Sequence, residues 1–444
     1  MNKSKLIDKN SGLSIRNTVI LIIVHILLGF AADRWGAIST LHAVITLFAA
    51  IILVLRNKET AKVIMAAAYI TGAEVLWRMT DANIFWEFGK YAVIGILVLA
   101  MLRQKRAGMV SMAILFIGLM TISIPLTFIN LPFGDARQAV SFNLSGPLTL
   151  AVSVMYFSQV GISKADLSRV IFWFAAPVVS IATINISKIN SYTQIIFSDN
   201  SNFATSGGFG PNQVSAILGL AGLFLILEII VCGAKWHRVW LSLGLSVGFF
   251  VLSGITFSRG GLYNVAASLI AVLVLSSANP KVQLSFIFFL LVLWGSWKNV
   301  ILPKLDAFTG GSFLMRFTNL DTTGRLELAQ TQLELWKRNF IFGVGPGMGG
   351  WEYLKFFGRT MAAHTEYSRM LLEHGIFGFG SLILMLVMPI RKFFSNRDRF
   401  SNIWLGALVV WSLVEMSHSA TRIAAVGFVF GFGFLSIIDD HEEK

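Results

Sequence analysis

A short stretch near the C-terminus, AAHTEYSRMLLEHG at residues 362–375, gathers side chains capable of acid–base chemistry in a strongly apolar chain. His364 stands at its start, and an imidazole can accept a proton near neutral pH, as a general base must. Judged by its position alone, however, His364 is more typical of a structural histidine that anchors a helix end than of a catalytic base. Arg369 and Glu373 are four residues apart, which predicts a salt bridge that orients a helix, with His374 packed beside it.

Arginines form the second set of candidate residues, because a guanidinium can grip a phosphate with two parallel hydrogen bonds. Arg259, in FSRGG, ends an apolar run and precedes two glycines that permit close backbone approach. Arg325 stands in the first turn of a predicted helix, where free N–H groups attract anions. The arginines expected on the same side of the molecule as His364 are Arg259, Arg316, Arg325, Arg359 and Arg422.

A metal site is not expected. Asp33 and Asp135 lack carboxylate neighbours in sequence, and the nearby Arg34 and Arg137 make salt bridges the expected role. The single cysteine, Cys232, excludes an intramolecular disulfide and a cysteine-rich metal site. A base with several guanidiniums and no cofactor fits transfer from a diphosphate-linked lipid, in which arginines stabilise the departing diphosphate.

The composition places these residues in a membrane protein. Of 444 residues 55% are hydrophobic and 13% charged, and the mean hydropathy is +0.71, which is far more apolar than a soluble domain can bury. The net charge of +13 does not indicate nucleic-acid binding, because the basic residues cluster in short segments between apolar runs. We therefore expect an all-α integral membrane protein, with membrane lipids as its surroundings.

The apolar segments predict about 12–14 transmembrane helices. We place fourteen hydrophobic segments near 17–32, 36–55, 62–79, 84–102, 107–129, 140–160, 169–187, 211–232, 239–257, 261–277, 282–300, 366–390, 402–417 and 422–438, of which the last two could form one broken span. With a cytoplasmic N-terminus, alternate loops carry the basic residues, as the positive-inside rule requires. Residues 1–300 then form a helical bundle, 301–365 an extracytoplasmic loop and 366–444 the final helices, all of one integral domain.

The loop itself has two predicted features. GRLELAQTQLELWKRNF predicts an amphipathic helix with Leu326, Ala329, Leu333, Trp336 and Phe340 on its apolar face. The following GVGPGMGG predicts a tight glycine-rich turn that folds the loop back over the membrane, and a dinucleotide site is disfavoured because no strand precedes it.

Three motifs in series resemble the O-antigen ligase and polymerase superfamily of bacterial envelope glycosyltransferases. They are FSRGG (257–261), GRLELAQTQLELWKRNFIFGVGPG (324–347) and AHTEYSRMLLEHGIFG (363–378). The first 130 residues are similar only as a succession of helices. The resemblance implies a metal-independent, GT-C-like membrane fold in the bacterial inner membrane, with an active site facing the periplasm or cell exterior. It also implies an undecaprenyl-diphosphate-linked oligosaccharide as donor and a glycan or lipid-core acceptor.

By this resemblance His364 matches the catalytic base, while Arg259 and Arg325 match the arginines that stabilise the leaving diphosphate. The resemblance and position together assign substrate contacts to Arg316, Glu366, Tyr367 and Arg422, and supporting positions to Arg369, Glu373 and His418. Many relatives have Asn after the histidine, whereas this chain has Thr365 and then Glu366, so Glu366 is a second candidate for the base.

Alternatives remain within and outside this enzyme class. A ligase hands a finished glycan to a lipid core, whereas an O-antigen or exopolysaccharide polymerase joins repeat units; the loop favours the ligase by a small margin. A transporter of anionic solutes or lipids is the alternative of another class, with Glu74, Arg78, Glu87 and Lys90 as coupling charges.

Overall fold

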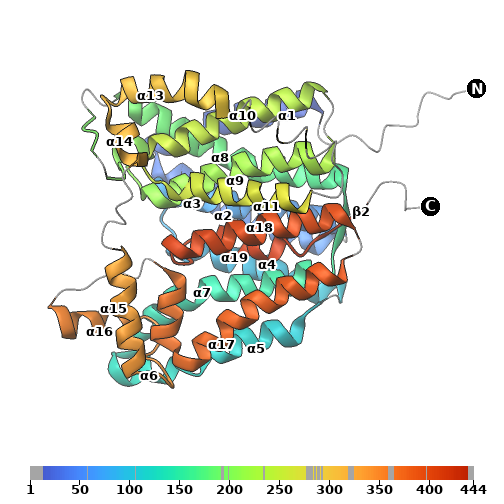
Figure 1. Ribbon diagram of the computed structural model, residues 1–444. Helices are drawn as coiled ribbons and strands as arrows, with labels where there is room; N and C mark the ends of the chain where they lie inside the picture. The colour runs from blue at the N-terminus through green and yellow to red at the C-terminus, as the bar shows by residue number, and fades with distance from the viewer. Residues whose placement is uncertain are drawn as a thin grey trace, which may run out of the picture.

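The computed structural model is a bundle of long helices that run side by side, with its two termini leaving from one end (Figure 1). The structure describes residues 14–438 except 58, 106, 192–194, 199, 234–235, 277–283, 285–286, 288–290, 292–293, 319–324, 359–364 and 397. The helices of the first half are α1 (Ile15–Arg34), α2 (Gly36–Arg56), α3 (Thr60–Met79), α4 (Phe88–Gln104), α5 (Val110–Thr121), α6 (Ile124–Asn130), α7 (Phe133–Phe157) and α8 (Lys164–Ser191).

The second half continues the bundle and adds short helices at one end. Its helices are α9 (Pro211–Leu227), α10 (Trp236–Ile255), α11 (Gly260–Leu275), α13 (Leu302–Phe308), α14 (Ser312–Thr318), α15 (Arg325–Arg338), α16 (Gly349–Phe357), α17 (Glu366–Ser395), α18 (Arg399–His418) and α19 (Ala424–Phe432). Shorter elements are η1 (Ala204–Ser206), the π-turns η2 (Glu228–Cys232) and η3 (Trp297–Ile301), and the parallel strands β1 (Gly161–Ser163) and β2 (Ser436–Ile438).

Among the described residues, nine helical stretches are long and apolar enough to cross a membrane. The α-helical class predicted from the sequence is confirmed, and these helices are compatible with a multi-pass membrane protein. Only 22% of the apolar window of α1 is buried, against 89% for residues 211–232. The bundle therefore has central helices enclosed by protein and outer helices that present apolar side chains outward, as a lipid surrounding requires. About half of the predicted segment 282–300 falls outside the described residues.

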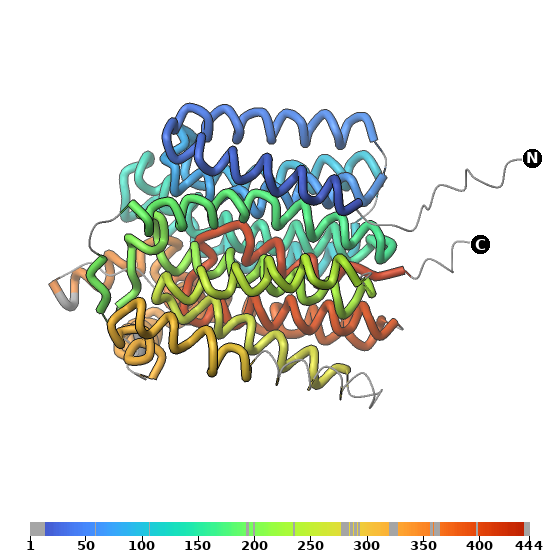
Figure 2. The backbone as a smooth tube through the Cα atoms, turned by 90° about the horizontal axis from the view of Figure 1, so that it is seen from above, coloured from blue at the N-terminus to red at the C-terminus, as the bar shows by residue number. Residues whose placement is uncertain are grey.

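The two ends of the bundle differ in character. One end of the bundle holds the β1–β2 pair. Contacts at this end join turns that carry basic residues. The Gly108 amide donates to the Met155 carbonyl at 2.8 Å, and Lys392 Nζ lies 3.3 Å from Ser436 Oγ. At the opposite end α13 to α16 gather, with α15 lying across the direction of the long helices (Figures 1 and 2). The sequence-predicted basic loops and the predicted site are thus at opposite ends.

His25 and His42 have the structural role expected for histidines on apolar helices. Trp77 Nε1–H donates to His42 Nδ1 at 2.9 Å, so His42 Nε2 carries the ring proton and donates to the Tyr69 oxygen at 2.8 Å. The Tyr69 hydroxyl then donates to His25 Nε2 at 2.9 Å, and His25 Nδ1–H donates to the Leu21 carbonyl at 2.8 Å. Every member of this partly buried chain is satisfied with neutral rings, and it ties α1, α2 and α3 together.

Two breaks interrupt the helices nearest the predicted site. The single span predicted for 366–390 is broken at Gly375, which has φ 59° and ψ −136° inside α17. The loop before α17 fills the gap, because the Ile376 amide donates to the Ile341 carbonyl at 3.2 Å. The second break separates α18 from α19, a helix of nine residues that are all buried. In both places backbone groups inside the bundle lack helical partners and must find others.

Gly375→Ala tests the first break. A Cβ at this position would lie 2.6 Å from the Gly343 nitrogen, and the positive φ is strained for any L-residue; together these should cost about 1–3 kcal/mol or more. We expect a lower midpoint of thermal unfolding in detergent. The matched control is Gly244→Ala in α10, where nothing lies within 4 Å of an added Cβ and the helix gains in propensity. Equal midpoints for the two variants would contradict the assigned break.

Candidate functional site

The candidate site is built around the connection of residues 419–423 between α18 and α19. Its free amides are met by carboxylates: the Thr421 N–H donates to Glu366 Oε2 at 3.0 Å and the Thr421 hydroxyl to Glu366 Oε1 at 3.2 Å. The Ala424 N–H, at the start of α19, donates to Glu74 Oε2 at 2.5 Å. A helix N-terminus favours negative charge, so both acids stabilise the break while being stabilised by it.

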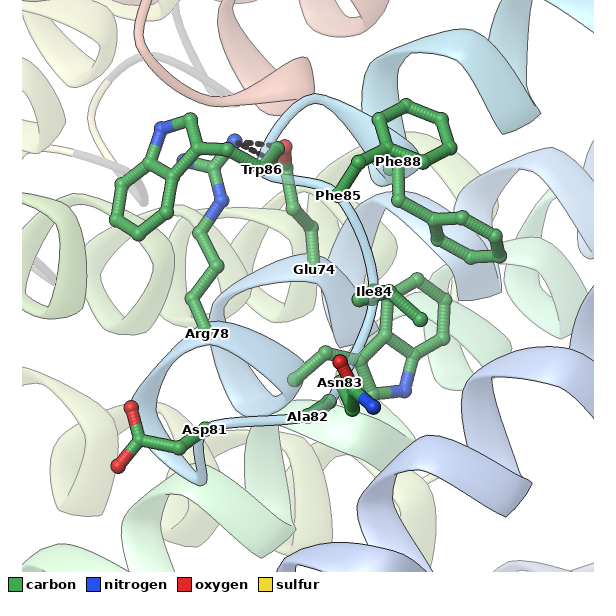
Figure 3. Close-up of a pocket in the computed structure, with 11 residues that line it drawn as sticks. Glu74, Arg78, Asp81, Ala82, Asn83, Ile84, Phe85, Trp86 and Phe88 are labelled. Atoms are coloured by element: carbon green, nitrogen blue, oxygen red, sulfur yellow. Dashed lines mark hydrogen bonds and ion pairs between the residues drawn. The ribbon is translucent and has the colours of Figure 1, made fainter.

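Basic side chains meet the carbonyls of the same connection. Arg78 Nη1 donates to the Arg422 carbonyl at 2.8 Å, and Lys90 Nζ lies 3.5 Å from the Thr421 carbonyl. Arg78 also pairs with Glu74 at 2.6 Å, as Figure 3 shows, and its guanidinium lies 4.6 Å from the centre of the Trp86 ring. Helices α3 and α4 are therefore attached to the α18–α19 connection through charge.

Lys90 is the least compensated of these charges. Its side chain is fully buried, and within the described part of the chain no carboxylate oxygen lies within 4.0 Å of its ammonium group. Besides the Thr421 carbonyl, it has the ring of Phe142, 5.5 Å away. Glu74 and Glu87 act on the Lys90 charge only from a longer distance, and a buried ammonium without a direct ion pair is costly, so this position favours an anion nearby.

The start of α17 holds a second ion network, centred on Arg369. Its Nε donates to Glu366 Oε2 at 3.1 Å and its Nη2 pairs closely with Glu366 Oε1. Its Nη1 pairs with Glu373 at 3.1 Å and donates to Asn143 Oδ1 at 2.8 Å. The predicted Arg369–Glu373 salt bridge is confirmed, and Glu366 extends it into a triad that joins α17 to α7. His374 is completely buried, as predicted.

The glycine-rich segment 343–350 wraps around Glu373. A Cβ added at Gly349 would lie 3.4 Å from Glu373 Oε1, and the Gly345 amide donates to the Glu373 carbonyl at 3.0 Å. Gly343 has φ 69°, and a Cβ there would lie 2.5 Å from the Glu373 carbonyl. The predicted tight turn is confirmed; only glycines allow this backbone to approach α17 so closely.

Helix α15 packs on α17 with a face that includes a polar residue. Its buried side chains are Leu328, Gln332 and Leu335, whereas Leu333 is 37% exposed. Gln332 accepts a hydrogen bond from Ser368 at 2.5 Å. The predicted helix is present, and Leu333 and Phe340 of its apolar face are exposed while Gln332 docks it on α17. Exposed apolar side chains are compatible with an amphipathic helix at a membrane surface.

A cavity of about 220 Å³ lies where these parts meet. The polar and charged residues that line it are Asn143, Gln332, Arg369, Glu373 and Arg422, together with Gly347, Gly349 and Gly350. A neighbouring cavity of about 420 Å³ is lined by Glu74 and Arg78 (Figure 3). Hydrogen-bond donors held in a fixed arrangement around a small cavity can stabilise an anion without reorganising.

Arg259, Arg316 and His418 lie together at adjoining helix ends. Arg259 immediately precedes α11, and the next residue, Gly260, packs against the His418 imidazole. Arg316 Nε donates to the Phe257 carbonyl, two residues before Arg259, at 3.0 Å. His418 is the last residue of α18, so the structure brings these predicted residues to the same end as Arg422.

His418 and Arg422 do not share a helix, in agreement with the separate segments predicted at 402–417 and 422–438. Helix α18 ends at His418, whose Nε2 lies 3.0 Å from Asn264 Oδ1, while Arg422 belongs to the connection and lines the cavity. The expected Asp33–Arg34 pair is wrong: Asp33 binds Lys188, at 2.9 Å, because its helix places it against α8.

Tyr367 and Glu366 are engaged in contacts within the protein. The Tyr367 hydroxyl donates to the Leu413 carbonyl at 2.6 Å and joins α17 to α18. Glu366 is 1% exposed, with both carboxylate oxygens bonded. Both positions are therefore suited to holding the site in shape.

Some predicted residues fall outside the described part of the chain. His364 and Arg359 are among them, as is the side chain of Arg325, although α15 begins at that residue. Thr365, directly after His364, caps α17 by accepting from the Ser368 amide at 3.1 Å, so the candidate base precedes the ion network in the chain.

Sequence reasoning missed that Glu74, Arg78 and Lys90 belong to this site. Their signal was present, since ionisable residues in apolar segments mark functional or network positions. Among the described residues, no group of three or more His, Cys, Asp or Glu side chains is arranged to hold a metal ion. In comparisons with known proteins, the chain matches no family model and shows no significant similarity to a curated protein.

Arg369→Lys tests the triad. Lysine keeps the charge but cannot contact two carboxylates and Asn143 at once, so buried acceptors are left unsatisfied at about 1–3 kcal/mol each. We expect a clearly lower unfolding midpoint in detergent. Arg103→Lys, an exposed change at the end of α4, is the control and should leave the midpoint unchanged. A triad variant as stable as this control would show that the guanidinium geometry is unimportant.

Proposed function

We propose that the protein is a metal-independent, inverting glycosyltransferase of the O-antigen ligase type. It would transfer a glycan from undecaprenyl diphosphate to an acceptor hydroxyl at the outer face of a bacterial inner membrane. The GT-C-like architecture and the extracytoplasmic position of the 301–365 loop are part of this proposal. Its basis is the motif resemblance together with the chemistry of the site at the end of the bundle opposite the termini.

The observation that carries the proposal is the balance of charge around the α18–α19 connection. Four basic groups, Arg78, Lys90, Arg369 and Arg422, face three carboxylates, Glu74, Glu366 and Glu373. Arg259 and Arg316 add positive charge at the adjoining helix ends. Cationic groups fixed close together in a low-dielectric setting attract a polyanion, and a lipid diphosphate supplies one.

The proposed reaction is a direct displacement. His364 takes the proton from the acceptor hydroxyl, whose oxygen bonds to the anomeric carbon of the donor sugar. The bond from that carbon to the diphosphate oxygen breaks, and the electron pair leaves with undecaprenyl diphosphate. Arg259 and Arg325 stabilise the negative charge that develops on the leaving group. The imidazolium then returns its proton to water.

The remaining residues have supporting roles in this scheme. Arg422 and Arg316 contribute positive charge for the donor, and His418 and Tyr367 hold the ends of α18 and α17 in register. Glu366, Arg369 and Glu373 keep the start of α17, and with it the attachment point of His364, in a fixed orientation. A polymerase that joins repeat units would use the same chemistry, and the acceptor decides between polymerase and ligase.

A carrier of anionic solutes or lipids is the second candidate, and one observation favours it. Helix α17 is broken at Gly375, and α18 and α19 are separated by a connection inside the bundle. Interrupted helices with charged side chains at the break are typical of transporter binding sites. The two candidates differ in whether a covalent bond is made.

His364→Ala tests the choice. With purified protein, lipid-linked oligosaccharide and acceptor, we expect product formation to fall about 100-fold or more when the base is lost. His237→Ala, exposed at the opposite end in α10, is the control and should retain activity. The measurement is glycan product separated from lipid-linked donor.

Two results would count against the enzyme. Product formation by His364→Ala at the wild-type rate removes His364 as the base. Flux of an anionic solute or lipid in proteoliposomes, unchanged by this substitution and without any transfer product, favours the carrier.

Arg259→Lys separates charge from geometry. Because lysine cannot form the bidentate contact with phosphate, we expect kcat to fall at least about tenfold while the charge is kept. Arg103→Lys again serves as control. Near-normal turnover in Arg259→Lys would remove Arg259 from the diphosphate site.

A further inference from the structure

A third and larger cavity, of about 1030 Å³, lies between the start of α4 and the first turns of α7. Aromatic and polar side chains alternate around it: Trp86, Glu87, Tyr91, Arg137, Gln138 and Ser141. The rings are open to solvent or ligand, since Trp86 is 46% and Tyr91 36% exposed. Its size is at the upper end of small-molecule sites, so it can hold more than one sugar ring.

The polar groups of this cavity are largely uncommitted within the protein. Tyr91 and Ser141 hydrogen-bond to each other at 2.9 Å across the cavity, between α4 and α7. Among the described residues, the side chains of Glu87, Arg137 and Gln138 have no hydrogen bond or ion pair. A carboxylate, a guanidinium and an amide beside exposed rings offer donors and acceptors to a ligand rich in hydroxyls.

The cavity adjoins both charged cavities of the candidate site. It shares Phe142 with the cavity lined by Arg369 and Arg422. It shares Trp86 with the one lined by Glu74 and Arg78 (Figure 3). A ligand lying along it would therefore have one end beside the buried cations.

We propose that this cavity is a carbohydrate subsite for the acceptor glycan, an inference that rests on the proposed function. The C–H face of a sugar packs against the electron-rich face of Trp86 or Tyr91, and the ring hydroxyls reach the polar groups. A lipid tail matches this lining less well, because it would leave Glu87, Arg137 and Gln138 without partners. The cavity thus holds the acceptor while its terminal hydroxyl points toward the charged cavities.

Exposed aromatic rings can also anchor a protein at a membrane surface, and the structure has an exposed aromatic pair outside the proposed subsite that serves as a control. Phe128 and Phe133 pack on each other at 5.7 Å between ring centres, at the end of α6 and the start of α7. Phe133 is 74% exposed and does not line the proposed subsite. It is therefore the control for aromatic exposure without a carbohydrate site.

The test is glycan binding to the full-length protein in nanodiscs of phosphatidylethanolamine and phosphatidylglycerol. The probe is oligosaccharide released by mild acid from the lipid-linked pool of the native host, with a dextran oligomer as unrelated glycan. We expect saturable binding by wild type, weakened about tenfold by Trp86→Ala and by Gln138→Ala, and unchanged by Phe133→Ala. Gln138→Ala covers the case in which Trp86→Ala fails to fold.

Equal affinities in wild type and both subsite variants, or no saturable binding by wild type, would overturn the inference. The inference would also be overturned if the subsite variants bound glycan normally but lost a phospholipid that copurifies with wild type, because the cavity would then be a lipid site.

Transfer kinetics separate this inference from the proposed function. Subsite variants should raise the KM for acceptor about tenfold and leave the KM for donor unchanged. Site-dependent glycan binding without any transfer by wild type would leave the subsite standing and remove the glycosyltransferase. Normal transfer with an acceptor KM that these substitutions do not change would support the glycosyltransferase and overturn the subsite.

Discussion

The structure depends on the need to satisfy backbone groups where α18 ends and α19 begins. Inside a bundle of apolar helices no water is assured for these groups, and each unsatisfied one costs several kcal/mol. The chain meets the need with charge: Glu366 and Glu74 accept from amides, and Arg78 donates to a carbonyl. Helices α3 and α17, far apart in sequence, are thereby held to one connection, since each provides charged side chains that no apolar residue could replace.

The same arrangement concentrates charge where a ligand can use it. Buried ions are stable only when paired and hydrogen-bonded, and Arg369 meets this requirement through two acids and Asn143. Lys90 makes no direct ion pair among the described residues, and Glu74 and Glu87 act on its charge from a longer distance. Fixed cations of this kind act on an anion without first losing hydration, which is the physical basis of preorganised electrostatic stabilisation. Stability and the proposed chemistry therefore rely on one network.

Breaks in helices give the site its shape. At Gly375 the helix direction changes and the glycine turn 343–350 enters the gap, so that its backbone lies against Glu373. The turn can do so because its glycines adopt positive φ and carry no Cβ. Helix α15 is held against α17 by Gln332 and Ser368, a polar contact that an apolar pattern cannot reveal.

The sequence predicted more of the fold than of the site. Hydropathy located the membrane-type helices, and spacing located the Arg369–Glu373 pair, because both depend on neighbours along the chain. Proximity in sequence failed for Asp33, because its partner is Lys188 on another helix and not the adjacent Arg34.

Composition and periodicity by themselves determined the all-α class, the approximate helix positions and the ionisable residues that stand out from apolar surroundings. Only the tertiary structure decided which of those residues meet: Glu74, Arg78 and Lys90 join residues 366–373 through a connection more than 300 residues away from α3 in sequence. The reason is that helix formation is governed by contacts a few residues apart, whereas the pairing of buried charges depends on which helices pack together.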